Sequence, residues 1–255
     1  MPLHRTDAFV LRTYTLKEAD KICVLFTRDS GKVRAVAKGA RKLRSRFGSS
    51  LEPLTEVALS YYQKENQELA SISTCDILRT QFSDEITSER LGALHYIAEL
   101  VIEFVPDHEP NERIYRLVGA IVEAMRSSGS PELPAISRYF EIWMLRLSGF
   151  LADLSSCHVC GRALANEQSV WLTSEGAPVC PSCSRQRGDE LRREVLAGLK
   201  DILARKPIDF FSVRRDSRVL QQIGTLASKL IRRTIERDLK SVAFVDRLRV
   251  TNNNN

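Results

Sequence analysis

Long hydrophobic runs are absent from this chain of 255 residues. No stretch approaches the roughly 18 uninterrupted apolar residues that a membrane-spanning helix needs. The opening segment Met1–Asp7 lacks the apolar core of a signal peptide. We therefore expect no membrane span and a location in the cytoplasm, where thiols stay reduced.

Motifs that carry catalysis are also absent. Ser30-Gly31-Lys32-Val33 lacks the upstream glycine and the hydroxyl residue of a phosphate-binding loop, and no GxSxG nucleophile turn occurs. None of the four histidines is followed two residues later by the glutamate that a zinc deaminase requires. Glu99 and Glu103 lie four residues apart in a helical pattern and are expected to form a solvated surface. These observations predict a protein that is not an enzyme.

Positive charge is concentrated at the two ends of the chain. The net charge is +6, but residues 1–80 hold 14 basic and 9 acidic side chains, and residues 190–255 hold 15 and 8. Residues 81–130 hold 4 basic and 9 acidic side chains. The positive charge therefore lies in the two ends of the chain, with an acidic stretch between them.

The first 80 residues have the period-2 alternation of β-strands. Turn signals such as Asp29-Ser30-Gly31 separate the runs. Five short strands of this kind predict a closed barrel of the OB type, with an SH3-like barrel and a small sandwich as alternatives. The predicted strands are Ala8–Tyr14, Ile22–Thr27, Val33–Ala37, Val57–Gln63 and Leu69–Leu78.

From about residue 84 the apolar period changes to that of amphipathic helices. The pattern predicts an α+β protein with an OB-type barrel over 1–80 and a helical domain over 81–255. The polar run 252–255 is predicted to be a disordered tail. The five predicted helices are centred on 91–105, 114–125, 135–147, 191–203 and 219–231.

Two CxxC pairs interrupt the helical pattern, Cys157/Cys160 and Cys180/Cys183. Their spacing matches a zinc ribbon, in which two tight turns direct four thiolates at one ion. We expect one Zn²⁺ per chain, held by these four cysteines in an insertion over about 155–188. A complete thiolate shell leaves no position for water or substrate, which predicts a structural site rather than a catalytic one.

A run of cations with no acid lies between residues 32 and 46. It covers the third predicted strand and a glycine- and serine-containing loop from Gly39 to Gly48, and it predicts contacts to a nucleic-acid backbone. Phe47, Tyr14, Tyr61 and Tyr62 are the candidate stacking surfaces, and a merely solvated basic surface is the alternative. The predicted DNA-binding residues are Lys32, Arg34, Lys38, Arg41, Lys42, Arg44 and Arg46.

A second set of cations flanks the last predicted helix. Cations beside an apolar helix face suit a short acidic peptide with a hydrophobic end. The alternatives are that they complement the helix dipole or add affinity for DNA. The candidate partner-binding residues are Arg214, Arg215, Arg232 and Arg233.

These parts together resemble the RecO family of bacterial recombination mediators. The resemblance covers about residues 1–250. It rests on the strand Ala8–Leu11, on Asp20, on the turn Asp29–Gly31, on the turn Lys38–Arg41, and on the order barrel, helices, paired CxxC motifs, helices. It implies an OB-fold, a helical domain with a zinc module that some members have lost, and a role in DNA repair by homologous recombination.

The resemblance also implies activities and partners. Members bind single- and double-stranded DNA, anneal complementary strands, and work with RecR to load RecA onto DNA coated by single-strand-binding protein. The acidic tail of the single-strand-binding protein becomes the expected peptide partner, and a cytoplasmic, nucleoid-associated location follows. The alternatives are a zinc-ribbon accessory factor of transcription or translation that binds protein or RNA, and a nuclease or other metal enzyme.

Overall fold

The computed structural model describes the chain except for residues 1, 65–66, 83–85, 186–187, 236–238 and 242–255. The predicted disordered tail, 252–255, therefore lies outside the described residues. The described residues divide into two compact units. One lies within 1–122 together with 239–241, and the other lies within 123–235. The predicted α+β class is confirmed, because a closed β-barrel is followed by helices and a small three-stranded sheet.

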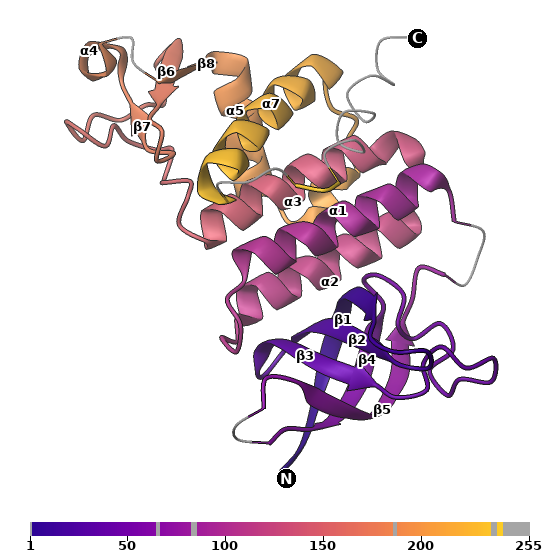
Figure 1. Ribbon diagram of the computed structural model, residues 1–255. Coiled ribbons are helices and arrows are strands. Elements are labelled where there is room, and N and C mark those ends of the chain that lie inside the picture. The colour runs from indigo at the N-terminus through magenta and orange to yellow at the C-terminus, as the bar shows by residue number, and fades with distance from the viewer. Residues whose placement is uncertain (1, 65–66, 83–85, 186–187, 236–238, 242–255) are drawn as a thin grey trace. The chain divides into compact units, whose positions relative to one another are not determined.

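The first unit is built on a closed five-stranded barrel with strand order β1-β2-β3-β5-β4 (Figure 1). All neighbouring strands are antiparallel except β3 and β5, which pair in parallel and close the barrel. Closure excludes the sandwich, and this order is that of an OB-type barrel. The strands are β1 Leu3–Thr15, β2 Lys21–Thr27, β3 Gly31–Ala37, β4 Glu56–Tyr62 and β5 Ala70–Arg79.

Alternate residues of each strand point into the barrel and form its core, as the period-2 pattern predicts. Val10, Leu25 and Val57 are at most 1% exposed, although each lies in a different strand. Residues of the long β3–β4 loop complete this core, with Phe47 and Leu51 both buried against it. The loop is therefore attached to the barrel through its apolar side chains.

Two helices belong wholly or largely to this unit, α1 Ser88–Phe104 and α2 Glu112–Ser127. Thr87 caps α1, because its hydroxyl accepts a hydrogen bond from the Arg90 N–H at 3.2 Å. A buried network joins α2 to the barrel. The Tyr115 hydroxyl donates to Glu56 at 3.1 Å, and Glu56 also pairs with Arg79 at 2.6 Å. The burial and this neighbouring carboxylate raise the pKa of Tyr115.

Glu99 of α1 corrects the prediction of a solvated carboxylate. Its side chain is only 4% exposed and pairs with Arg12 of β1 at 3.4 Å. The backbone N–H groups of Lys240 and Ser241 donate to its two carboxylate oxygens at 3.0 and 2.8 Å. Glu99 therefore binds a segment 141 residues away in sequence, a contact that helical periodicity could not indicate.

The second unit combines helices with a small sheet of order β7-β6-β8. Helix α5 contacts β6 and β8, and α3 packs against α5 and α7. The elements are the 3-10 turn η1 Ser130–Glu132, α3 Leu133–Leu147, β6 Ser169–Leu172, β7 Pro178–Val179, α4 Pro181–Ser184, β8 Asp189–Arg192, α5 Arg193–Ala204, α6 Pro207–Phe211 and α7 Ser217–Ile235.

A buried ion pair lies where α3 and α7 meet. Arg138 and Glu141 are one turn apart on α3, pair at 2.8 Å, and have side chains 5% and 0% exposed. Gly224 of α7 lies directly over Arg138, since a Cβ at this position would come within 1.8 Å of a guanidinium nitrogen. Any larger residue at this position would have to displace the Arg138 side chain.

Candidate nucleic-acid interface and metal centre

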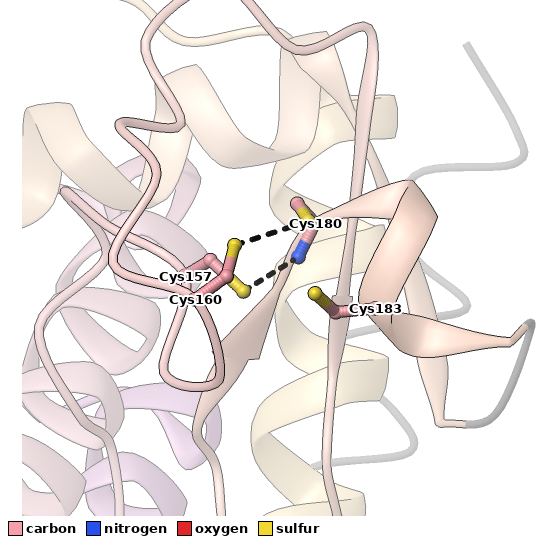
Figure 2. Close-up of side chains that lie close together, drawn as sticks. All are labelled: Cys157, Cys160, Cys180 and Cys183. Atoms are coloured by element: carbon pink, nitrogen blue, oxygen red, sulfur yellow. Dashed lines mark hydrogen bonds between the residues drawn. The ribbon is translucent and has the colours of Figure 1, made fainter.

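The four predicted zinc ligands converge on one point in the second unit (Figure 2). The sulfur atoms of Cys157, Cys160, Cys180 and Cys183 all lie within 4.8 Å of one another. The Cys160 and Cys180 sulfurs are 3.8 Å apart. Four sulfurs at about 2.3 Å from a tetrahedral zinc ion are separated by about 3.8 Å, so the cluster has the size that zinc requires.

Two tight turns hold these cysteines, as the CxxC spacing predicts. In the first turn, the Gly161 N–H donates to the Cys157 carbonyl at 2.9 Å, and Gly161 has a φ of +71° that favours glycine. In the second turn, Pro181 opens the short helix α4 immediately after Cys180, and the Cys183 N–H donates back to the Cys180 carbonyl at 3.1 Å. The small sheet connects the two turns through β6 and β7.

The environment of the cluster favours thiolate at one position before a metal binds. Burial by itself raises the pKa of Cys157, but N–H donors from Cys180, Cys160 and Val159 lower it to about 6. Hydrogen bonding to the Cys180 and Cys160 sulfurs raises the pKa of Cys183 to about 12. Four thiolates this close together need a cation to compensate their charge, and a tetrahedral set of four sulfurs is the shell of structural zinc sites, so the donor set fits Zn²⁺.

The seven predicted DNA-binding cations have different environments. Lys32 is only 8% exposed, and its ammonium donates to the Ile102 carbonyl at 2.7 Å and pairs with Asp107 at 3.2 Å. A lysine held in this way stabilises the contact between β3 and the end of α1 and is not available to a phosphate. Arg34 is exposed and lies 3.9 Å from the same carboxylate.

Two of the loop arginines hold the loop in place. The Arg41 guanidinium donates to the carbonyls of Lys17 and Glu18, each at 3.0 Å. Arg46 donates to the Ile72 carbonyl at 3.2 Å and covers the Phe47 ring. Lys38, Lys42 and Arg44 are exposed and make no ion pair with any carboxylate in the described part of the chain.

A groove of about 780 Å³ borders this surface and adds two cations that the sequence reasoning missed. It lies over β3, between the β1–β2 loop and the β4–β5 loop. Its lining includes Lys38 together with Lys17 and Lys64, and also the acidic Asp20 and Glu68. In OB-folds this face and these two loops bind oligonucleotides. The signal for Lys17 and Lys64 was their position in the loops of a predicted OB barrel.

The candidate stacking aromatics divide into two groups. Phe47 and Tyr61 are buried in the barrel core at 4% and 2% exposure, so the prediction that they stack on bases is wrong. Tyr61 was misassigned because an aromatic at an alternating strand position fits either face until the register is known. Phe47 was misassigned because it lies in a loop that has no periodicity. Tyr14 and Tyr62 are exposed at the ends of β1 and β4.

The cations of the second unit do not form one site. Helix α7 is 19 residues long, so its ends are about 28 Å apart. Arg214 and Arg215 precede it, whereas Arg232 and Arg233 lie in its last turn. Arg215 pairs with Asp201 at 2.5 Å and covers the Phe210 ring, and Arg233 pairs with Asp189 at 3.3 Å.

A smaller pocket of about 360 Å³ lies between β8, α5 and α7. Its apolar lining comes from Leu191, Val195 and Leu226. Its charged lining comprises the cations Arg192 and Lys229 and the acidic Asp189 and Glu190. Lys229 pairs with Asp189 at 2.6 Å, the same carboxylate that receives Arg233. The pocket thus combines the two features expected of a peptide site, an apolar floor and neighbouring cations, and places them beside the middle of α7.

Comparison with known proteins agrees with this architecture. Residues 1–81 match the family described as Recombination protein O N terminal, and residues 87–243 match Recombination protein O C terminal. No helix within the described residues is long and apolar enough to cross a bilayer.

Several proteins of similar length are similar to this chain over nearly all of its sequence. A protein of Koribacter versatilis called DNA repair protein RecO is 37% identical over 96% of this chain and 99% of its own length. Proteins of the same name from Geobacter metallireducens and Pelotomaculum thermopropionicum are 32% and 30% identical, over 96% and 97% of this chain and 97% and 95% of their own lengths. The chain belongs to the RecO family of DNA repair and recombination proteins.

Proposed function

We propose that this protein is a non-enzymatic recombination mediator whose barrel binds single- and double-stranded DNA and anneals complementary strands. The observation that carries the proposal is the groove on the β3 face of the barrel, which exposed cations border and two loops enclose. In this proposal the barrel over 1–80 binds DNA, and the domain over 81–255 carries the zinc module and the partner sites.

The exposed cations would bind phosphates, and the loops would follow the strand. Lys38, Lys42 and Arg44 have no acidic partner among the described residues, so their full charge acts on the DNA backbone. Lys17 and Lys64 extend the cationic path to the two loops of the groove. Arg34 contributes in part, Arg41 and Arg46 shape the loop, and Lys32 takes no part.

Annealing follows from this electrostatic arrangement. Two complementary strands repel one another, and a cationic surface that binds both backbones lowers that repulsion while it leaves the bases free to pair. Tyr14 and Tyr62 supply exposed rings at the ends of β1 and β4 on which unpaired bases would stack. No bond is made or broken in this process, so the proposed role needs no catalytic residue.

The zinc ion would be structural, held by Cys157, Cys160, Cys180 and Cys183. It would fix the two turns and the small sheet that borders α5 and α7. The shell is closed when all four thiolates bind, so the ion supplies folding free energy and no chemistry.

Partner binding belongs to the second unit in this proposal. The pocket beside Lys229 suits the acidic tail of the single-strand-binding protein, with its hydrophobic end on Leu191, Val195 and Leu226. The tail carboxylates would compete with Asp189 for Lys229 and Arg233. In this proposal the protein works together with RecR to load RecA onto the coated strand. It does so in the cytoplasm, associated with the nucleoid.

The decisive experiment is annealing of complementary strands coated with single-strand-binding protein, with and without this protein. We expect a large acceleration that higher salt suppresses, because the protein binds through charge. An annealing rate that this protein leaves unchanged contradicts the proposed function.

Calorimetry with the isolated tail peptide tests the pocket. Removing the last hydrophobic residue of the peptide should abolish binding, and Leu226→Lys should do the same from the protein side. The matched control is Gln221→Lys, on the exposed face of α7 outside the pocket. Binding that survives both changes would exclude this pocket.

A further inference from the structure

Leu43 is the one leucine of the β3–β4 loop that has no apolar environment. Its relative exposure is 103%, whereas Phe47, Leu51 and Leu54 of the same loop are 4%, 5% and 0% exposed. The loop therefore has a well-packed apolar base and an isolated apolar tip. Burying an exposed leucine at a loop tip against a partner is favourable, because it removes apolar surface from water.

The base of the loop is fixed on both sides of this leucine. On one side, the Gly39 N–H donates to the Asp20 carboxylate at 2.8 Å, and Arg41 donates to the carbonyls of Lys17 and Glu18. On the other side, Arg46 donates to the Ile72 carbonyl, and Phe47 is buried in the barrel core. Leu43 therefore extends from a short segment that is anchored at each end.

The neighbours of Leu43 indicate what it contacts. Lys42 and Arg44 flank it directly, and both are exposed. One of the two carbonyls that anchor Arg41 belongs to Lys17, which lines the groove proposed to bind the strand. An apolar tip between two cations, next to such a groove, fits a nucleobase between two phosphates. A protein pocket or a bilayer would leave the adjoining groove unused.

We infer that Leu43 is an apolar wedge that inserts beside a nucleobase at the junction of single- and double-stranded DNA, while Lys42 and Arg44 bind the flanking phosphates. This inference rests on the proposed function and adds a contact to bases. Leucine side chains inserted at a base step unstack it. At a junction, the wedge would hold the first unpaired base out of the stack and expose its pairing edge to an incoming strand.

A fluorescent base analogue tests this inference with the full-length protein. The probe is a partial duplex with 2-aminopurine at the first unpaired position, since its fluorescence rises when the base loses stacking. We expect a severalfold rise with the wild-type protein and its loss with Leu43→Ala. Affinity for the junction should fall about fivefold, because a partly buried leucine side chain is lost.

Two further variants separate the wedge from other roles. Leu43→Met keeps a long apolar side chain and should retain the fluorescence rise. Leu78→Ala removes a different exposed leucine of the barrel, 49% exposed on β5, and should change nothing. Because no charge is altered, the dependence of affinity on salt should be the same for all of these proteins.

The outcomes distinguish the wedge from DNA binding itself. A Leu43→Ala protein that keeps the full fluorescence rise overturns the wedge and leaves the proposed function standing. A wild-type protein that binds no DNA overturns both. A Leu43→Ala protein with normal junction binding but no binding to anionic vesicles or to RecR assigns Leu43 to that surface instead and also overturns the wedge.

Discussion

The two basic ends of the chain have similar charge in the sequence but use it differently in the structure. In the barrel, Lys38, Lys42 and Arg44 have no carboxylate within ion-pair distance among the described residues. In the second unit, Asp201 pairs with Arg205 and Arg215, and Asp189 pairs with Lys229 and Arg233. A charge counted from the sequence thus does not tell which cations are held by carboxylates and which face an anion alone.

The largest expected effect distinguishes the units by their metal dependence. Cys180→Ser should remove zinc and lower the thermal transition by about 10 °C or more, because metal binding is coupled to folding of the second unit. Elemental analysis and thermal unfolding measure the two effects. Cys75→Ser, at a buried cysteine of the barrel, is the control and should keep one zinc per chain. Full zinc content in the Cys180→Ser protein would refute the four-cysteine site.

The next effect tests the free cations against the paired ones. Changing Lys38, Lys42 and Arg44 together to Ala should flatten the slope of log K against log salt for single-stranded DNA by about 2, since each contact contributes about 0.7. The matched control changes Lys229 and Arg233 to Ala, and its slope should equal that of the wild type. Titrations at several salt concentrations measure both slopes. Equal flattening in the two variants would mean that the second unit binds DNA as strongly as the barrel does.

A smaller effect tests the close packing of the second unit. Gly224→Ala should lower the free energy of unfolding by about 1–3 kcal/mol, because its Cβ would displace the buried Arg138 guanidinium from Glu141. Chemical denaturation measures the change. Thr225→Ala, at the next and exposed position of α7, should have little effect. A Gly224→Ala protein as stable as the wild type would show that α7 does not pack on this ion pair.

The smallest expected effect is a pH dependence of the protein's stability, which arises from Glu99 in the first unit. Burial by itself raises the pKa of Glu99, but donors from Ser241 and Lys240, with Arg12, outweigh it and lower the pKa. A carboxylate with a lowered folded pKa stabilises the protein above its unfolded value, near 4.5, and loses this contribution as the pH falls through the folded pKa.

Glu99→Gln should therefore cost about 1–2 kcal/mol at pH 7 and progressively less below pH 4.5. Denaturation curves at several pH values measure this difference. Glu18→Gln, at an exposed position of the β1–β2 loop, is the control and should follow the wild type throughout. A constant difference between Glu99→Gln and wild type at all pH values would contradict the role of the ionised carboxylate.

Local patterns predicted the elements and the metal cluster well. The period-2 runs gave all five strands to within a few residues, since half-buried strands must alternate. The paired CxxC spacing predicted the convergence of Cys157, Cys160, Cys180 and Cys183, because each pair is a local turn and thiolates require a common cation. These features depend on residues close together in sequence.

The burial of Lys32, Glu99 and Phe47 could not be predicted from the sequence, because each side chain contacts residues far away in the chain. Lys32 is buried by residues about 70 positions away, and Glu99 binds a segment 141 positions away. Phe47 enters the barrel core from a loop that has no periodicity. Composition and local spacing carry no information about such contacts.

The amino-acid sequence by itself determined the α+β order of elements, the five strands of the first unit, the four-cysteine cluster and the basic character of the two ends. Only the tertiary structure decided which cations remain free, which are consumed by carboxylates or carbonyls, and where Leu43 stands among them. The physical reason is that periodicity and short spacings act along the chain, whereas the effective charge and exposure of a side chain depend on the neighbours that folding brings to it.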